Sequence, residues 1–458
     1  MYKRMALAVL LIAITSVTSA QMLRTGYFVD GNVMRYRLNP ALVSIRGHFS
    51  LPVLGGIDLN TSSNVGLSNF IYESALNSDQ LVTFMHPTVS AEEFLNGLDS
   101  NNRIAVDMDF TLFSLAFHAW GGFSSIDLSL RSMTGLSLPY DMFRFMKVSG
   151  NGEYNFGDMN LYSRDFADLS IGHTRKITRG ITIGARLKFL FGLAYANASF
   201  DNMRLQASAD RWKIMAHGTA DVALGGRFGV SEDNTVDSYQ GAAVGIHGFG
   251  VGADIGALYE VKGGLLKGLS LSASLNDLGY IVWKEAAHAA IEPSSPYTFD
   301  GFDNVAINGD DNTLEEQIDA IGDDLGDFFT LENKGVRSVN DGIGAKLNIG
   351  AEYVMPFWRG LSVGVLYTNC FDGIYSYNQA MLALNLSPLS FMDFAFSGRV
   401  GTYGTGFGAL VNIHFPGLSL FAGTDCFLGK VTPQYIPIGK TNASVSLGVN
   451  IALGKAKR

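Results

Sequence analysis

Two glycine-containing stretches have residue types that could bind a nucleotide. Gly439-Lys440-Thr441 resembles the second half of a phosphate-binding loop, in which backbone N–H groups and a lysine hold phosphate. Gln434 stands where such a loop needs its first glycine, so we expect no nucleotide site there. Residues 404–409 have the spacing of a dinucleotide fingerprint, but they lie between two expected strands without a following helix. We interpret these glycines as relief for strand packing or a tight turn.

Metal-binding and hydrolytic chemistry find no support in residue spacing either. The eight histidines are scattered and do not have the spacing of metal ligands. Asp300, Asp303, Asp310 and Asp311 could hold Ca²⁺, but a solvated acidic segment is the better interpretation because no calcium-loop pattern surrounds them. A serine, a histidine and an acid could still meet across strands, so a hydrolase remains a third hypothesis. We expect no enzyme, no catalytic residue, no cofactor and no metal site.

Strands are the elements that would position any functional side chain, and a recurring phrase marks where several begin. The phrase is a glycine followed by apolar, Ser/Thr and apolar residues. Its four copies start at Gly180, Gly268, Gly360 and Gly417. In residues 181–189, Ile, Ala, Leu and Phe alternate with Thr182, Gly184, Arg186 and Lys188. A period of two predicts a β-strand whose two faces meet different environments.

The composition indicates which environments these are. Only 16% of residues are charged and 12% are aromatic, with 53 Gly against 11 Pro. Soluble proteins usually carry about a quarter charged residues. Around 104–112 and 126–131, the second face of each strand carries Asp107, Asp109, Asp127 and Arg131, which fit a wet lumen better than a dry core. Apolar outside and polar inside is the pattern of an all-β transmembrane barrel.

The N-terminal residues predict export to the outer membrane. Residues 1–20 have a basic start at Lys3 and Arg4, an apolar core over 5–14 and a small-residue cleavage site at 18–20, which together are typical of a signal peptide. No other stretch supplies 18 uninterrupted apolar residues for a spanning helix. We therefore expect a mature chain that crosses the outer membrane with strands.

Sixteen alternating stretches between residues 47 and 453 are candidate strands, two of them at 180–196 and 201–217. In this order the four repeated turns all join an even strand to the next odd one, whereas the long connections 67–102, 135–160 and 284–341 join odd to even. Short turns at one end and long loops at the other are typical of outer-membrane barrels, and we expect both termini on the periplasmic side.

The long connections contain three predicted helices. Ser90-Ala91-Glu92-Glu93 reads as a capping box, Pro139 begins an apolar helix over 139–147, and a second capping box at 313–316 begins an amphipathic helix over 313–329. The last lies in an acidic insertion, since residues 284–340 hold 13 acidic and three basic residues. No basic patch exists elsewhere, which argues against nucleic acid as a partner.

Four short motifs in a fixed order resemble a family. They are Arg37–Ala41, Ser90–Leu95, Leu138–Phe143 and Asn276–Gly279 followed by Trp283. Together they resemble an uncharacterised family of outer-membrane barrels from Gram-negative bacteria, a domain of unknown function. That family is similar to the long-chain fatty-acid transporter superfamily and to PorV-type barrels of the type IX secretion system. The resemblance covers essentially the whole mature chain and implies a barrel of about 14 strands.

The resemblance also implies a division of the chain and one candidate site, and the unusually apolar helix over 139–147 supplies a second. Residues 21–45 would form a hatch in the lumen of a barrel formed by 46–458, with Asn39, Pro40 and Ala41 either as a moving hatch or as a fixed plug. The apolar side chains Met142, Phe143, Phe145 and Met146 would either contact a hydrophobic ligand at the outer mouth or simply pack a loop.

Three functions follow from these observations, in order of preference. The first is transport of a small hydrophobic compound through a plugged barrel. The second is an interaction barrel, whose long loops and acidic segment dock a secretion or surface protein. The hydrolase is the third. In each case membrane lipid is the expected partner of the outer wall.

Overall fold

The alternation after Gly180 forms one long strand, β9 (Ile181–Ala207), with two different faces. Ile183 and Leu187 are about half exposed (47% and 51%), whereas Arg186 and Lys188 on the other face are buried (4% and 2%). An outward face of apolar side chains and an inward face of charged ones indicates a transmembrane wall around a polar lumen. The expectation from the sequence is therefore confirmed.

A computed structural model describes residues 22–454 apart from 51, 53, 76–79, 149, 294, 301–323, 325–326, 428–439 and 441. Its wall strands are β1 (Gly47–Ser50), β2 (Ile57–Ser63), β5 (Asn101–Ala119), β6 (Gly122–Pro139), β8 (Met159–Lys176), β9, β10 (Trp212–Ala223), β13 (Gly248–Glu260), β14 (Leu269–Ile291), β16 (Glu332–Gly342), β17 (Ala345–Val354), β18 (Leu361–Phe371), β19 (Tyr377–Leu389), β20 (Met392–Gly401), β21 (Gly404–Phe415), β22 (Leu418–Thr424) and β23 (Ala443–Leu453).

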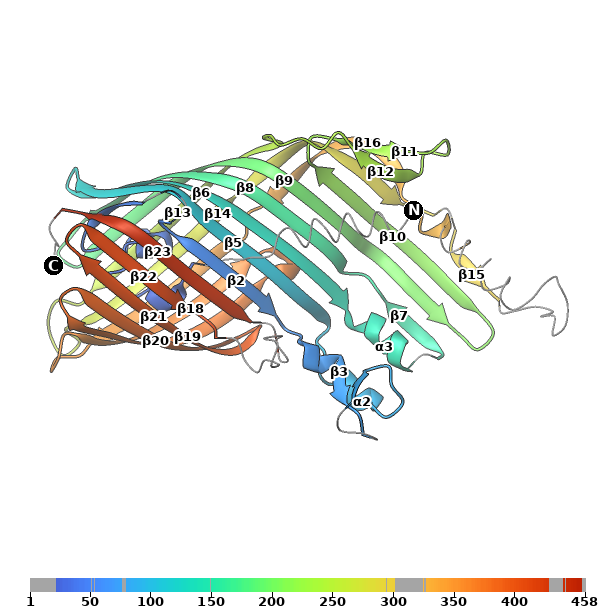
Figure 1. Ribbon diagram of the computed structural model, residues 1–458, viewed down its shortest axis with the longest axis horizontal. Helices are drawn as coiled ribbons and strands as arrows, with labels where there is room; N and C mark the ends of the chain where they lie inside the picture. The colour runs from blue at the N-terminus through green and yellow to red at the C-terminus, as the bar shows by residue number, and fades with distance from the viewer. Residues whose placement is uncertain are drawn as a thin grey trace.

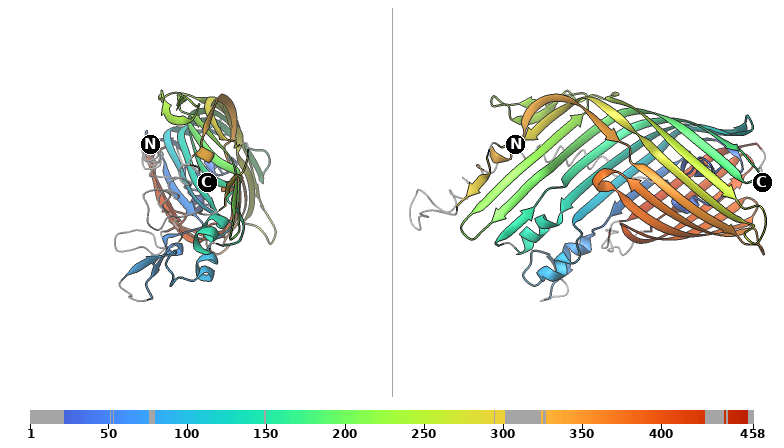
Figure 2. Two further views of the ribbon diagram at one scale, coloured as in Figure 1. Left: turned by 90° about the vertical axis from the view of Figure 1, so that its right-hand side faces the viewer. Right: turned by 180° about the vertical axis from the view of Figure 1, so that it is seen from behind.

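These strands form a closed antiparallel barrel of fourteen wall positions. Figure 1 shows the barrel from the side. Closure comes from β1 and β2, which together fill one position and pair with β23 on one side and β5 on the other. β16 and β17 also share one position beside β14. Figure 2 shows that β9, β10 and β14 extend much further at one end than β18 to β23, so the wall is taller on one side.

The expected number of about 14 strands is confirmed, and the tally of sixteen is wrong for two reasons. The stretches at 180–196 and 201–217 are not separate strands, because β9 runs unbroken to Ala207. β10 and β13 instead lie end to end in one wall position. β10 pairs with residues 195–207 of β9, and β13 pairs with residues 181–192 of the same strand. Residues 224–247 leave the wall between them and form a hairpin, β11 (Arg227–Val230) and β12 (Val236–Gln240).

The two ends of the barrel differ as the sequence predicts. The four repeated turns lie between β8 and β9, β13 and β14, β17 and β18, and β21 and β22, all at one end, here called the inner end. The longer connections 64–100, 140–158 and 292–331 lie at the opposite, outer end. β1 starts and β23 ends at the inner end, because Gly47 pairs with Leu453.

The outer connections contain two of the predicted helices. α2 (Ala91–Leu95) starts where expected, with the Glu93 N–H donating to the Ser90 hydroxyl at 3.0 Å. α3 (Tyr140–Val148) matches the apolar helix expected over 139–147. Small strands accompany them: β3 (Ile71–Glu73), β4 (Leu81–Thr83), β7 (Gly152–Asn155) and β15 (Tyr297–Phe299). In the described part of the chain, each helix is too short or too polar to cross a membrane.

The expected limits of the acidic insertion, 284–341, are too wide. β14 continues to Ile291 and β16 begins at Glu332, so both ends of that segment are strand. Glu285 and Glu332 therefore belong to strands of the wall and not to a loop. The amphipathic helix expected over 313–329 falls largely outside the described residues.

Candidate functional site

Residues 22–46, here called the plug, lie inside the barrel near its inner end (Figure 1). They form two short 3₁₀ turns, η1 (Arg24–Gly26) and η2 (Arg35–Arg37), joined by irregular chain. Almost every residue from Leu23 to Leu42 is buried. Because irregular backbone cannot satisfy its own polar groups, the wall has to supply hydrogen-bond partners to it.

The Asn39–Pro40–Ala41 turn is one of the points where the wall does so. The Asn39 side chain is fully buried, and its amide nitrogen donates to the Tyr27 hydroxyl at 3.0 Å and to the Ala273 carbonyl at 3.3 Å. Its amide oxygen accepts from the Ala41 N–H at 2.9 Å. The Thr174 hydroxyl donates to the Pro40 carbonyl. This turn is thus fastened to β8 and β14 by polar contacts.

Two wall glycines make room for the same turn. A Cβ atom on Gly256 would lie 2.1 Å from the Asn39 amide oxygen, and one on Gly184 would lie 2.3 Å from the Pro40 carbonyl oxygen. Side chains never approach so closely, so only glycine lets the plug contact the backbone of β9 and β13. The same holds for Gly408, where a Cβ would meet Thr25 at 2.5 Å.

Arg37 ties the plug to the opposite part of the wall. Its guanidinium donates to both carboxylate oxygens of Asp109 at 2.9 and 3.0 Å, to Thr111 at 2.9 Å and to Ser129 at 2.7 Å. Both partners of this ion pair are almost fully buried, with side-chain exposures of 4% and 5%. Removing one partner of such a pair leaves an uncompensated buried charge, which is strongly unfavourable.

The Arg37–Asp109 pair belongs to a charge network at mid-height of the lumen. Among the described residues it joins five cations to five carboxylates at distances of 2.5–3.8 Å. Its members are Arg37, Arg131, Arg186, Lys188 and Lys346 with Asp109, Asp127, Asp168, Asp254 and Asp277. The network is neutral as a whole, which lets so many charges lie away from bulk water.

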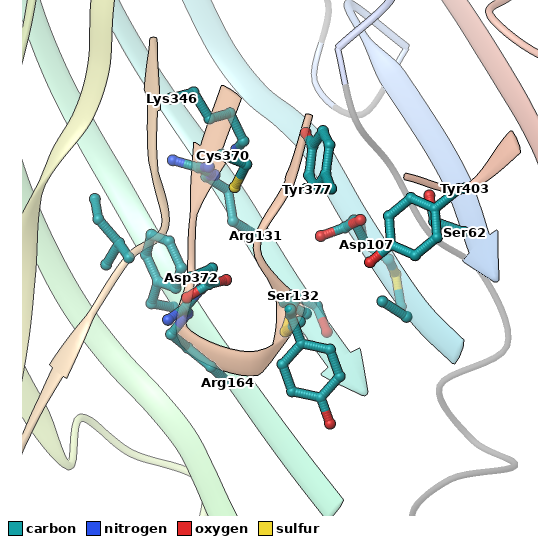
Figure 3. Close-up of a pocket in the computed structure, with 16 residues that line it drawn as sticks. Ser62, Asp107, Arg131, Ser132, Arg164, Lys346, Cys370, Asp372, Tyr377 and Tyr403 are labelled. Carbon is teal, nitrogen blue, oxygen red and sulfur yellow. The ribbon is translucent and has the colours of Figure 1, made fainter. Parts of the chain in front are cut away.

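A small cavity lies on the outer side of this network (Figure 3). Its volume is about 40 Å³, enough for a few water molecules. Figure 3 shows Arg164 and Asp372 on one side of it and Tyr377, Tyr403 and Asp107 on the other. Aromatic rings and charged groups are thus mixed around the space.

A short segment, Asp372–Ser376, closes the lumen above the cavity, and we call it the strap. It joins β18 to β19 and contains the 3₁₀ turn η4 (Gly373–Tyr375). The Tyr375 hydroxyl donates to the Asn160 amide oxygen at 2.9 Å, and Arg164 donates to Asp372 at 3.2 Å. Phe166 lines the cavity, and it belongs with Tyr195, Trp283 and Tyr375 of the strap to one buried apolar cluster.

The strap could not be identified from the sequence, where residues 372–376 read as an ordinary tight connection between strands. Its signal is the presence of two tyrosines, Tyr375 and Tyr377, at the tip of a hairpin, where small polar residues are usual. A Cβ on Gly135 of β6 would lie 2.3 Å from the Tyr375 ring, which indicates how closely the strap approaches the far wall.

The apolar side chains of α3 lie in the outer loops and do not line the cavity beneath the strap. Phe143 packs with Phe70, Phe84 and Phe94 from the connection 64–100, and Phe145 packs against Tyr154, Phe156 and Trp212. Met142 touches both clusters and Met146 is 42% exposed. Of the two candidate sites, the structure brings only Asn39–Pro40–Ala41 into the lumen.

Replacing Phe143 by leucine therefore loosens the outer loops without opening the barrel. The substitution costs roughly 1 kcal/mol of packing between α3 and the 64–100 connection. Limited proteolysis of the reconstituted protein should cut that connection several-fold faster, while the folded barrel keeps its wild-type resistance to heat in detergent gels. A loss of that resistance would instead mean that α3 supports the barrel wall.

The serine, histidine and acid side chains that come close together do not have the arrangement of a Ser–His–acid triad. The expectation that residue spacing gives hydrolysis no support is wrong in one respect, because Gly360–Gly364 has the Gly-x-Ser-x-Gly spacing. This segment opens β18, however, and its Ser362 donates to Glu352 at 2.6 Å. Ser387 donates to Asp393 at 2.7 Å, and His414 lies 3.0 Å from the other oxygen of that carboxylate. The acid thus lies between serine and histidine, so the histidine has no position from which to take the serine proton. The described residues contain no cluster of three or more potential metal ligands.

Comparisons with known proteins were made for the sequence and for the fold. Residues 40–425 match a family described as "Family of unknown function (DUF5723)". No curated protein matches the sequence. The toluene transporter TbuX of Ralstonia pickettii is similar with a TM-score of 0.40 and 10% identity over 92% of this chain and 94% of that chain. A Pseudomonas aeruginosa FadL homologue is similar with a TM-score of 0.40 and 12% identity over 95% of this chain and 98% of that chain.

Proposed function

We propose that this chain, which belongs to the family of unknown function DUF5723, is a gated outer-membrane channel in its closed state. In the proposed mechanism the plug is a moving hatch, and a small, largely apolar compound passes through the lumen once the hatch has left its seat. The alternative of a fixed plug predicts no passage at all.

One observation carries this proposal: the wall closes without the plug. β1 and β2 pair with β23 and β5 residue by residue, so the barrel's hydrogen-bond ladder is complete before the plug is counted. The plug adds hydrogen bonds that involve a side chain, ion pairs, contacts with wall glycines and apolar packing against wall residues such as Leu366, Leu410 and Phe421. Such contacts can break and form again while the wall remains folded, whereas a plug strand inserted in the ladder could not leave.

The side chains along the path favour a compound with an apolar body. Phe166, Tyr195, Trp283 and Tyr375 fill the lumen on the outer side of the charge network. A compound with an apolar body could replace the contacts between these rings and keep them away from water. The compound also has to be compact, because the strap and the plug narrow the path at its two ends. The network itself is neutral, so a strongly charged compound gains little there.

A reversible lock on the plug tests the proposal. The Thr25 and Ser397 hydroxyl oxygens lie 2.7 Å apart, so Thr25→Cys with Ser397→Cys places two thiols within bonding distance. The native Cys370 and Cys426, both free and buried, are replaced by serine. We expect vesicles containing the reduced protein to take up at least one of a panel of aromatic hydrocarbons, alcohols and fatty acids, and oxidation to abolish that uptake.

Two results would contradict a gated channel. One is uptake that is equal before and after oxidation, which would mean that the path does not pass the plug. The other is uptake no faster than in empty vesicles for every compound, even with Asn39→Ala, which removes three of the turn's hydrogen bonds. The Thr25→Cys single variant, which cannot form the bond, controls for the oxidant itself.

A separate observation favours the second candidate function, a barrel that docks another protein. Phe70, Phe84, Phe94 and Phe143 give the outer loops an aromatic core of their own, outside the lumen, so these loops can present a stable surface. Affinity capture from outer membranes, with the intact chain and with a chain lacking 67–98, separates the two functions. A partner retained only by the intact chain would support docking, and an identical set of captured proteins would argue against it.

A further inference from the structure

We infer that the strap is a second, outer gate and that Tyr377 couples its movement to that of the plug. The inference rests on the proposed function, because a gate has meaning only in a barrel that opens. Its test requires no transported compound, so it can fail or succeed independently of any transport measurement.

The strap spans the lumen from one wall to the opposite one. β18 and β19, which carry it, are the ninth and tenth wall positions, whereas its contacts lie on β5, β6 and β8, the second to fourth. Arg103 of β5 donates to the carbonyl oxygens of Ile374 and Ser376, the latter at 3.3 Å. Together with the Tyr375–Asn160 hydrogen bond, these contacts hold the strap across the channel instead of along its rim.

The strap is a compact unit that cannot bend independently of the strand that follows it. The Asp372 N–H donates to the Ser376 hydroxyl at 2.9 Å, and that hydroxyl donates to the Gly373 carbonyl at 2.7 Å. Tyr377 comes directly after and pairs with Cys370 as the first residue pair of the β18–β19 hairpin. Any displacement of the strap therefore displaces Tyr377.

Tyr377 is also one of the residues that hold the start of the plug. The Arg24 guanidinium donates to the Tyr377 hydroxyl and lies 5.5 Å from the centre of its ring. Beside it, the N–H groups of Arg24 and Thr25 both donate to Asp425, at 2.8 and 2.7 Å. The first turn of the plug is thus held at two places: by its backbone on Asp425, which follows β22, and by the Arg24 side chain on the hairpin that carries the strap.

Because of these contacts, release of the strap and release of the plug favour each other. Withdrawal of the strap from Arg103 and Asn160 carries Tyr377 away from Arg24 and weakens the plug's first anchor. Release of Arg24 in turn removes a contact that holds the hairpin in place. The geometry therefore favours concerted opening of strap and plug over alternation of an outer and an inner gate.

A double-variant cycle with a reporter in the plug tests the coupling. Val33, which is 1% exposed, is replaced by cysteine in a chain that also has Cys370→Ser and Cys426→Ser, and a membrane-impermeant maleimide measures how often the plug opens. Tyr375→Phe removes the hydroxyl that donates to Asn160, and Tyr377→Phe removes the one that accepts from Arg24. Loss of a single hydrogen bond should raise the labelling rate about 2- to 10-fold in each case.

The double variant decides the question. If Tyr377 is the link, adding Tyr375→Phe to Tyr377→Phe raises the labelling rate no further. Effects of the two substitutions that simply multiply, or a Tyr375→Phe rate equal to that of the unsubstituted reporter, would overturn the coupling. Tyr154→Phe is the matched control, because its hydroxyl donates to Gly150 at 3.2 Å in the outer loops and its loss should leave labelling unchanged.

Discussion

Replacing Arg37 by methionine should leave the plug out of its seat for most of the time. The substitution keeps the length of the side chain but leaves the buried Asp109 carboxylate without its partner at 2.9 Å. Breaking a buried ion pair from one side costs about 3–5 kcal/mol. That cost falls on the seated plug and not on the wall, because Arg37 belongs to the plug. Single-channel recording in planar bilayers should show a channel that is predominantly open.

Removal of the second charge should reverse this effect. With Asp109→Asn added to Arg37→Met, no buried carboxylate is left unpaired, and most of the closed time should return. The folded barrel should survive both changes, as judged by its resistance to heat in detergent gels. Equal open times for the single and the double variant would show that the ion pair does not hold the plug.

The second large effect is expected from a single methyl group on β13. Gly256→Ala places a Cβ only 2.1 Å from the Asn39 amide oxygen, which is too close for non-bonded atoms. The Asn39–Pro40–Ala41 turn therefore has to move. Overpacking of this kind costs about 1–3 kcal/mol, which corresponds to a roughly 5- to 150-fold rise in the ratio of open to closed time. Conductance measured under the same conditions as for Arg37→Met should detect it.

The same strand supplies a control for this substitution. Gly252 also faces inward, but a Cβ there would have no neighbour closer than 3.4 Å, an ordinary contact. Gly252→Ala should therefore remain closed. If both alanine variants open equally, the effect comes from a stiffer strand and not from the plug, and the close contact at Gly256 is irrelevant to gating.

The wall was predictable from the sequence wherever the membrane imposes a regular alternation. Ile183 and Leu187 face outward and Arg186 and Lys188 inward, as their spacing indicates. The strict in–out alternation of burial is lost in the outer parts of β9 and β14. This is why 197–200 read as a break in what is one strand, β9, and why the limits of the acidic insertion were placed too far apart.

The site was predictable only in its local part. Asn39-Pro40-Ala41 stands out because an Asn-Pro turn shortly before a barrel resembles a known pattern. Its partners Gly184 and Gly256 could not be chosen among 53 glycines, since the contact depends on how the plug lies against β9 and β13. The strap was missed for the same reason: whether Tyr375 reaches Asn160 depends on the tilt and curvature of the whole wall.

The balance of charges in the lumen has a consequence for the open pore. Of the five cations in the charge network, Arg37 alone is on the plug and departs with it. The wall then keeps Arg131, Arg186, Lys188 and Lys346 against five aspartates, so one carboxylate, that of Asp109, is left in excess. A ring of side chains with surplus negative charge admits cations more readily than anions. In the proposed open state the network would change from neutral to singly negative, and departure of the plug would make the pore weakly cation-selective.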